Sequence, residues 1–455
     1  MPCRQAHPQH SACLRCQQTT ECAMPSSATV APKISAVLRS RSSWLFESTS
    51  TSSKESEEMR KMESDFDPLD LSQGIPYSGL ARLRAEAPVY KIPSGYWFLS
   101  RYEDVLAAAE AIDTFKSSFR SPGVVVPEDE MLISEIPEPR HGWMRKILNS
   151  AVAVHSIGAV RPFVRELSER LLDDILKSGR GELISDFCVP IPNSVIAYLL
   201  GVPAQDFPLW ARWADDVVQG DYATENRNER GEGFAGGFPE FSAYVDRKIA
   251  ERRSQTDAPD DLINRMMTGD VQGKRLTDVE LRTQIIFLLV AGNETTRNLI
   301  GNILARLAAE PELYRKLREQ RELVPNMVEE TLRVQPSAVY LIRDCIKDTQ
   351  IRGVDIRKGE KVVFGLASAN RDEEKFENPD EFRLDRPDPK LHLAFGAGRH
   401  VCPGAALARL EATSALEVMV ERVAELRFEP GYERERIPVF WSDGPVSVPV
   451  ELVAA

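Results

Sequence analysis

The chain has 455 residues, of which 42% are hydrophobic and 28% charged, proportions typical of a globular protein. Its net charge of -12 argues against nucleic acid or an anionic membrane surface as a general partner. The longest uncharged apolar stretch, residues 285–292, has only eight residues, whereas a membrane-spanning helix needs about 20. We therefore expect no membrane span.

Residues 1–62 differ in composition from the rest of the chain. They are rich in Ser and Thr, show no apolar periodicity and contain few acidic residues. Such a segment cannot bury enough apolar surface to fold, so we expect a disordered extension before a globular domain at 63–455. A basic, Ser-rich composition with few acidic residues is also typical of a targeting segment. A third interpretation is a translation start placed too early, with Met59 or Met62 as the first residue.

The seven cysteines fall into two groups. Four lie within the first 22 residues, and the other three are scattered over the rest of the chain. Scattered cysteines without a paired framework predict a reducing compartment, and hence a cytoplasmic protein. Cys13 and Cys16 have the spacing of half a zinc site, but no strict second pair accompanies them.

Helical periodicity dominates the chain from Asp65 onward. Apolar residues at three- and four-residue spacing predict helices over 80–87, 102–111, 160–178, 194–200, 207–218 and 241–253, and another helix from Pro139. Two short strands are predicted within 89–99, on either side of Pro93-Ser-Gly.

Two connections between these helices are long. Residues 117–138 contain several Pro, Gly and acidic residues, and a loop of this length in a compact domain usually has a function. Residues 221–237 are polar and glycine-rich, which predicts a mobile connection. Between them, Trp210 and Trp213 could cover a substrate cavity, although aromatic residues at helical spacing more often belong to the core.

A long helix is predicted between Thr277 and Pro311. Thr277 and Glu280 form a capping box, in which each side chain binds a backbone amide at the start of the helix. The centre of the helix reads Ala291-Gly292-Asn-Glu294-Thr295-Thr, in which glycine, β-branched residues and a charge all disfavour a buried helix. We expect a bend or bulge here, with the Thr295 hydroxyl bonded to the backbone of its own helix.

The following segments predict a further helix and a small sheet. Glu330 and Arg333 lie on one face of a helix that ends before Pro336. Residues 337–342 are apolar, and residues 346–366 alternate between polar and apolar positions, which predicts a small antiparallel sheet.

Cys402 lies in a glycine-rich loop directly before Pro403 and a predicted helix over 405–423. Proline suits the first turn of a helix, because the amide that it lacks would have no partner there. The helix N-terminus favours an anion, so we expect a lowered pKa for the Cys402 thiol and a thiolate that can bind a metal.

The motif Phe395-x-x-Gly398-x-His400-x-Cys402-x-Gly404 resembles the haem-binding loop of the cytochromes P450. The resemblance covers roughly residues 65–455 and implies their fold, mainly α with small β-sheets in one large domain. It makes Cys402 the proximal ligand of the iron of haem b. Phe395, Gly398, His400 and Gly404 would surround the haem.

Three further motifs follow the order known in this family. His141 and Arg145, together with Arg343 and His400, would bind the haem propionates. Glu294 and Thr295 match the acid–alcohol pair that delivers protons during oxygen activation, and Ala291 and Gly292 would lie beside the haem. Glu330, Arg333 and Arg386 match a structural cluster that holds the haem loop in place.

The resemblance implies a monooxygenase that inserts one oxygen atom of O2 into a hydrophobic small molecule. Apolar residues at 339–342 and Phe440 would contact this substrate. The chain contains no flavin or iron–sulfur segment, so electrons would come from NAD(P)H through a separate ferredoxin and ferredoxin reductase. Arg145, Arg399 and Arg409 are candidates for the docking patch, although surface arginines are often only solvated. We expect a monomer.

Two other functions remain open for a haem-thiolate protein of this kind. One is a peroxygenase driven by hydrogen peroxide, but such members typically lack the acid–alcohol pair. The other is a haem-thiolate sensor or carrier without catalysis, which would not need Glu294 and Thr295.

Overall fold

The computed structural model describes residues 66–72, 74–117, 126–152, 158–219, 233–439 and 441–455, all of which belong to one compact unit. The predicted extension at 1–62 and most of the predicted mobile connection at 221–237 therefore lie outside the described residues. None of the helices described could cross a membrane.

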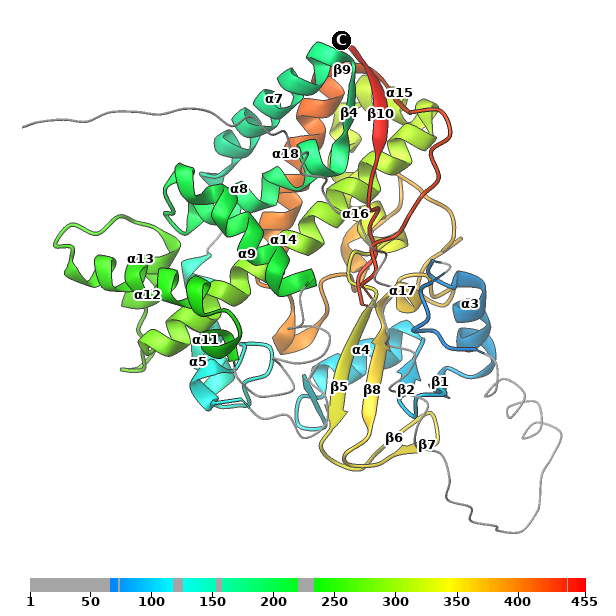
Figure 1. Cartoon of the computed structure of the whole chain (residues 1–455). Helices are drawn as coiled ribbons and strands as arrows, with labels where there is room; N and C mark the ends of the chain where they lie inside the picture. Colours follow the sequence, from blue (N-terminus) through cyan, green and yellow to red (C-terminus); the bar gives the residue numbers. More distant parts are fainter. Residues whose placement is uncertain (1–65, 73, 118–125, 153–157, 220–232, 440) are drawn as a thin grey trace, which may run out of the picture. The chain divides into compact units, whose positions relative to one another are not determined.

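The described part of the chain is mainly helical, as predicted (Figure 1). The helices are α3 (Tyr77–Glu86), α4 (Tyr102–Glu110), α5 (Arg140–Ala151), α7 (Arg161–Ser178), α8 (Pro190–Leu199), α9 (Phe207–Gln219), α11 (Gly233–Gly237), α12 (Pro239–Ser254), α13 (Leu262–Thr268), α14 (Asp278–Ala309), α15 (Pro311–Glu319), α16 (Val324–Val334), α17 (Leu366–Ala369) and α18 (Ala405–Arg422). Every predicted helix is present, with its bounds shifted by a few residues.

The strands form small sheets at two places in the fold. They are β1 (Val89–Lys91), β2 (Trp97–Leu99), β3 (Phe115–Ser117), β4 (Arg180–Glu182), β5 (Tyr340–Cys345), β6 (Thr349–Ile351), β7 (Val354–Ile356), β8 (Lys361–Gly365), β9 (Val423–Phe428) and β10 (Pro449–Ala454). One sheet has the order β1-β2-β8-β5-β3 and another the order β4-β10-β9, while β6 and β7 form a hairpin.

The sheet predicted for residues 346–366 differs from the one observed. β6 and β7 form a separate two-stranded hairpin. β8 instead belongs to the five-stranded sheet, where it lies between β5 and β2 and is parallel to β2. A parallel partner from the first hundred residues leaves no local sequence signal, because its register is set by contacts far apart in the chain. All five residues of β8 are buried, as expected for a central strand.

The long helix α14 runs through the helical part of the molecule beside α18, with α7, α8 and α16 around them (Figure 1). Its predicted capping box is confirmed: the Glu280 amide donates to Thr277 Oγ1 at 3.2 Å, and the Thr277 amide donates to Glu280 Oε2 at 2.7 Å. The buried apolar residues of α14 join two core clusters, one with α7, α16 and α18 and one with α5, α9 and α12.

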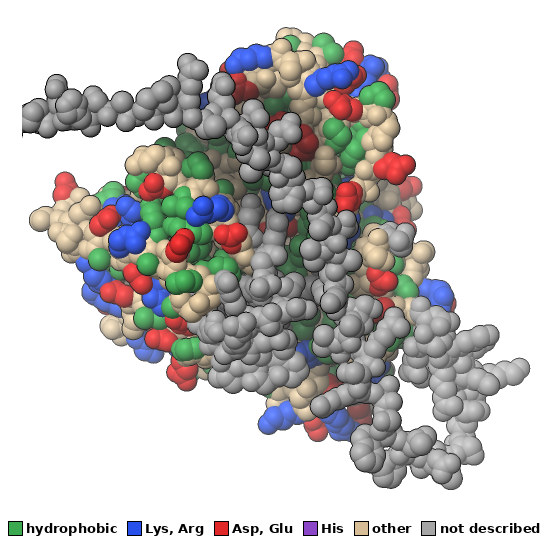
Figure 2. Space-filling view, viewed as in Figure 1, with side chains coloured by type: hydrophobic (Ala, Val, Ile, Leu, Met, Phe, Trp, Pro, Cys, Tyr) green, Lys and Arg blue, Asp and Glu red, His purple; other side chains and the backbone are tan. Residues whose placement is uncertain are grey.

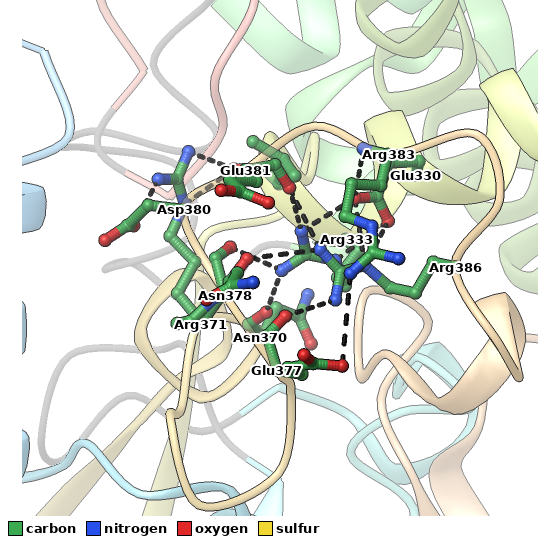
Figure 3. A network of polar contacts seen from close by, with 12 residues as sticks. Glu330, Arg333, Asn370, Arg371, Glu377, Asn378, Asp380, Glu381, Arg383 and Arg386 are labelled. Atoms are coloured by element: carbon green, nitrogen blue, oxygen red, sulfur yellow. Dashed lines mark hydrogen bonds and ion pairs between the residues drawn. The ribbon is translucent and has the colours of Figure 1, made fainter.

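The predicted structural cluster is present, with Glu330 and Arg333 near the end of α16 (Figure 3). Arg333 donates from Nε and Nη2 to the two carboxylate oxygens of Glu330 at 2.9 and 2.8 Å, and both side chains are fully buried. Arg386 donates from Nε to the same carboxylate at 3.0 Å. The remaining guanidinium nitrogens bind backbone carbonyls of residues 370–381, so the buried charges are fully hydrogen-bonded. This network fixes the segment that leads into the Cys402 loop.

Candidate active site

The loop around Cys402 is shaped by glycines with positive φ. Gly396 and Gly398 have φ of +70° and +65°, a conformation that residues with a side chain rarely adopt. A Cβ atom on Gly398 would lie 2.7 Å from the Ala109 carbonyl oxygen at the end of α4. Glycine is therefore required at 398 both for its conformation and for the close approach of α4.

Cys402 lies at the end of this loop, three residues before α18. Its amide donates to the Phe395 carbonyl at 2.9 Å, which closes the loop on itself. The residue is accessible to solvent, yet surrounding protein atoms desolvate it and raise the pKa of its thiol. Amides of Gly404 and Ala405 and the charges of Arg145 and Arg409 act in the opposite direction but do not outweigh burial. The prediction of a lowered pKa is wrong for the free thiol.

Four basic side chains from three parts of the chain meet near Cys402. The rings of His141, on α5, and His400 lie 4.4 Å apart between centroids. Burial, followed by the nearby charges of His141, Arg343 and Arg145, lowers the pKa of His400 to about 4. The fold thus brings together all four residues that the sequence proposed as one group.

Arg343 is the most isolated of these basic groups. It is 8% exposed, and no carboxylate among the described residues pairs with it; its guanidinium carbon lies 5.3 Å from the centre of the Phe364 ring. It donates to the adjacent Ile342 carbonyl at 2.9 Å. Burial lowers the pKa of Arg343 to about 10. A buried cation without a carboxylate partner is costly unless a ligand supplies the negative charge.

The centre of α14 is exposed to solvent, whereas the stretches on either side of it are mostly buried. Residues 281–286 and 298–305 are buried, whereas Ala291 is exposed and Gly292 and Thr295 are partly exposed. A Cβ atom on Gly292 would have no neighbour within 4 Å. Thr295 Oγ1 donates to the Ala291 carbonyl at 3.1 Å, as predicted. The helix type does not change between Asp278 and Ala309, so the bulge, one of the two predicted forms, is absent, and the bend stays a prediction.

Glu294, next to Thr295, is buried and held by two residues of its own helix. Its carboxylate accepts from Asn298 at 3.0 Å and is paired with Arg297 Nη2 at 2.7 Å. Asn298 also donates to Ser442 Oγ at 3.0 Å, which ties this group to the C-terminal segment. A buried carboxylate needs polar partners, and Glu294 has them in Arg297 and Asn298.

Comparison with known proteins gives one consistent answer. The family model described as cytochrome P450 matches residues 238–438. The polyketide biosynthesis cytochrome P450 PksS of Bacillus subtilis (strain 168) is 31% identical over 402 residues, which cover 83% of this chain and 96% of that protein. The chain belongs to the cytochrome P450 family.

Other relatives agree. The cytochrome P450 monooxygenase PikC of Streptomyces venezuelae is 35% identical over 78% of this chain and 85% of its own length. A solved cytochrome P450 from Bacillus megaterium in complex with testosterone matches with a TM-score of 0.74 at 31% identity, over 83% of this chain and 99% of that one. The protein is thus a cytochrome P450 monooxygenase, an oxidoreductase with haem b as its cofactor.

The basic group near Cys402 fits the two carboxylates of a haem. Nε2 of His141 and Nε of Arg145 are buried without a hydrogen-bond partner in the described structure. Glu138 is the acid that faces this group, and it is already bound to His141 and to Arg399. The group has more positive charge and more donors than the protein itself satisfies, so it is suited to bind anionic groups of a ligand.

The three arginines proposed for partner docking differ in their surroundings. Arg399 is exposed and bonded to Glu138 at 3.0 Å. Arg145 is half-buried and donates to the Val401 carbonyl, and Arg409 is held by Glu329. Only Arg399 presents its charge fully at the surface.

The structure describes some of the residues proposed to lie near the substrate. Trp210 and Trp213 are buried and pack against Phe241 and Tyr244, so they belong to the core, the second of the two interpretations. Val339 is buried, and residues 341 and 342 are partly exposed on β5. Phe440 lies outside the described residues.

Sequence reasoning did not name Glu138, Arg297 or Glu329, which hold functional side chains. Arg297 follows Glu294 by three residues, a spacing that places both charges on one helix face. Glu138 precedes His141 by three residues and lies just before the start of α5. These two partners could have been found. Glu329 has partners far away in the sequence, so spacing alone could not reveal them.

Proposed function

We propose that this cytochrome P450 oxidises a hydrophobic small molecule with O2, using electrons from NAD(P)H delivered by a separate ferredoxin and its reductase. The observation that carries the proposal is the open centre of α14, where the Thr295 hydroxyl is anchored to Ala291 beside the buried Glu294. A partly exposed hydroxyl next to a buried carboxylate on the same helix forms a suitable path for protons.

When bound, the haem supplies the activation of O2, and its thiolate ligand favours O–O cleavage. Cys402 would be this ligand, and His141, Arg145, Arg343 and His400 would hold the propionates. Phe395, Gly398, Gly404, Ala291 and Gly292 would lie against the macrocycle, where small residues allow close approach.

Thr295 would position one water and pass protons from it. Its hydroxyl donates to the Ala291 carbonyl, which leaves the oxygen lone pairs free to accept a hydrogen bond from water. Glu294 would resupply protons by exchanging its bond to Arg297 for contact with solvent. Its pairing with Arg297 and Asn298 holds the carboxylate in place while the chain is at rest.

The substrate class follows from the apolar residues at 339–342 and from the relatives. One relative is named for polyketide biosynthesis, and the structure of another holds testosterone. Both names point to large hydrophobic substrates, which fits the partly exposed apolar residues 341 and 342 on β5.

Charges of both signs lie on the surface that a redox partner would meet on the face shown in Figure 2. On the face shown in Figure 2, Lys and Arg side chains are interspersed with Asp and Glu over the described helices. Such a mixed surface does not steer an acidic protein. Of the three candidate arginines, Arg399, within the Cys402 loop, is the exposed cation that we propose for docking a ferredoxin.

The test is turnover with NADPH, a ferredoxin and its reductase, with a substrate selected by the spectral shift of the haem on binding. In Thr295→Ala we expect product formation to fall on the order of 10²-fold, the lower end of the effect of a positioned proton donor. NADPH oxidation should continue, so that electrons are lost to reduced oxygen species. Thr295→Ser should restore product, because it retains the hydroxyl.

Thr296→Ala is the matched control, because Thr296 is the same residue type one position along and is buried. We expect it to retain the ratio of product to NADPH. An equal loss of product in both variants would contradict the role of Thr295. Product from hydrogen peroxide alone would instead support the peroxygenase, and ligand binding without any turnover would support a sensor or carrier.

A further inference from the structure

Two consecutive glutamates on α16 serve two different networks. Glu330 binds Arg333 and Arg386, as described above. Glu329 is also buried, but its side chain points to other partners, His392 and Arg409. The family resemblance explains the first network and says nothing about the second.

Glu329 is held by strong hydrogen bonds from both partners. Arg409 donates from Nε to Oε1 at 2.6 Å and from Nη2 to Oε2 at 2.9 Å, a bidentate ion pair. Nε2 of His392 lies 3.0 Å from Oε2. Because Nδ1 of His392 accepts from the Ala394 amide at 3.3 Å, the proton lies on Nε2, which donates to Glu329.

These contacts enclose the Cys402 loop from both ends. His392 precedes the loop, and Arg409 follows it on α18. A single carboxylate of α16 therefore fixes the entry and the exit of the loop. Burial alone would raise the pKa of Glu329, but the bonds from His392 and Arg409 outweigh it and lower that pKa to about 2. Glu329 is an anion at any pH at which the protein works.

Arg409 connects this network to the sulfur. Its guanidinium carbon lies 4.5 Å from the centre of the Phe395 ring, and the Phe395 carbonyl accepts from the Cys402 amide at 2.9 Å. Its charge is close enough to favour the thiolate form of Cys402. A positive charge near the sulfur also favours an added electron at a metal bound there.

We propose that Glu329 is a positioning residue that orients Arg409 and partly neutralises its charge, and that this ion pair sets the reduction potential of the iron bound by Cys402. The inference rests on the proposed role of Cys402 as the iron ligand. The two residues should act in opposite directions, because Glu329 is an anion and Arg409, its ion-pair partner, is a cation.

The test is the reduction potential of the holoenzyme, measured by spectroelectrochemical titration without substrate. In Glu329→Gln the loss of a negative charge should raise the potential, and in Arg409→Gln the loss of a positive charge should lower it. We expect each change to alter the equilibrium constant of the one-electron couple about two- to tenfold, where tenfold corresponds to about 59 mV. The double variant should return towards the wild-type potential.

Matched variants separate charge from structure. Arg409→Lys keeps the positive charge but loses the bidentate geometry, so it should lower thermal stability with little change in potential. Glu312→Gln removes the same charge from an exposed ion pair with Arg315 on α15 and should leave the potential unchanged.

Two kinds of failure can be told apart. If wild-type protein reduced under carbon monoxide lacks the absorption band for which the family is named, the thiolate assignment of Cys402 fails. If the band is present in all variants but Glu329→Gln and Arg409→Gln shift the potential in the same direction, or not at all, the proposal for Glu329 is overturned.

Discussion

Single residues decide how closely the Cys402 loop can approach the rest of the protein. Gly398 combines a positive φ with a position at which a Cβ atom would overlap the backbone of α4, so a side chain meets two separate penalties there. Gly353, in the turn between β6 and β7, has a φ of +81°, but a Cβ atom added to it would meet no other atom within 4 Å. The pair therefore separates conformational strain from steric overlap.

Gly398→Ala should destabilise the protein by about 2–4 kcal/mol, because backbone strain of roughly 1–2 kcal/mol adds to the cost of displacing α4. The variant should also retain less haem after gel filtration. Gly353→Ala should cost only the strain, about 1–2 kcal/mol, and retain haem fully. Urea unfolding measures the stabilities; equal losses in both variants would argue against the contact with α4.

At the scale of one element, α18 contains a buried acid without a visible role. Glu411 is 3% exposed, and its Oε2 has no hydrogen-bond partner in the described structure. Burial raises the pKa of Glu411 to about 8, so the side chain is neutral in the folded protein at pH 7. In the unfolded chain the same group would be ionised at that pH.

This difference predicts how stability depends on pH. Between pH 4.5 and 8 the folded protein binds one more proton at Glu411 than the unfolded chain, so this group makes the protein less stable as pH rises. At 1.36 kcal/mol per pKa unit the loss is about 3 kcal/mol by pH 7. The loss of stability is complete once the pH exceeds the pKa of Glu411 in the folded protein.

Glu411→Gln should remove this dependence, because glutamine does not titrate. Its stability relative to wild type should increase by about 3 kcal/mol between pH 4.5 and 7 in urea unfolding. Glu417→Gln is the control on the same helix, since Glu417 is ion-paired with Arg161 near the surface. If the two variants respond to pH alike, Glu411 is ionised in the folded protein.

At the scale of the whole molecule, sequence patterns predicted most helices, and the family resemblance predicted the grouping of the site residues. Periodicity is a local signal, and the capping box of α14 depends on residues three apart, so both could be read directly. His141, Arg145, Arg343 and His400 could be grouped only through the resemblance to a family. No pattern within the chain indicates that α5, β5 and the Cys402 loop meet.

The features that sequence did not predict depend on tertiary contacts. The parallel pairing of β8 with β2 joins segments more than two hundred residues apart. The raised pKa of the Cys402 thiol arises from burial by surrounding chain, which outweighs the helix terminus that the sequence does reveal. The link from Glu329 to His392 and Arg409 likewise exists only after folding.

The most direct test of the account is the spectrum of the reduced holoprotein with carbon monoxide, compared between wild type and Cys402→His. Thiolate ligation by Cys402 predicts the absorption band for which the family is named in wild type. In Cys402→His the band should move to the position typical of imidazole ligation, with haem still bound. A wild-type spectrum without the family band, or an unchanged band in Cys402→His, would contradict the central role assigned to Cys402.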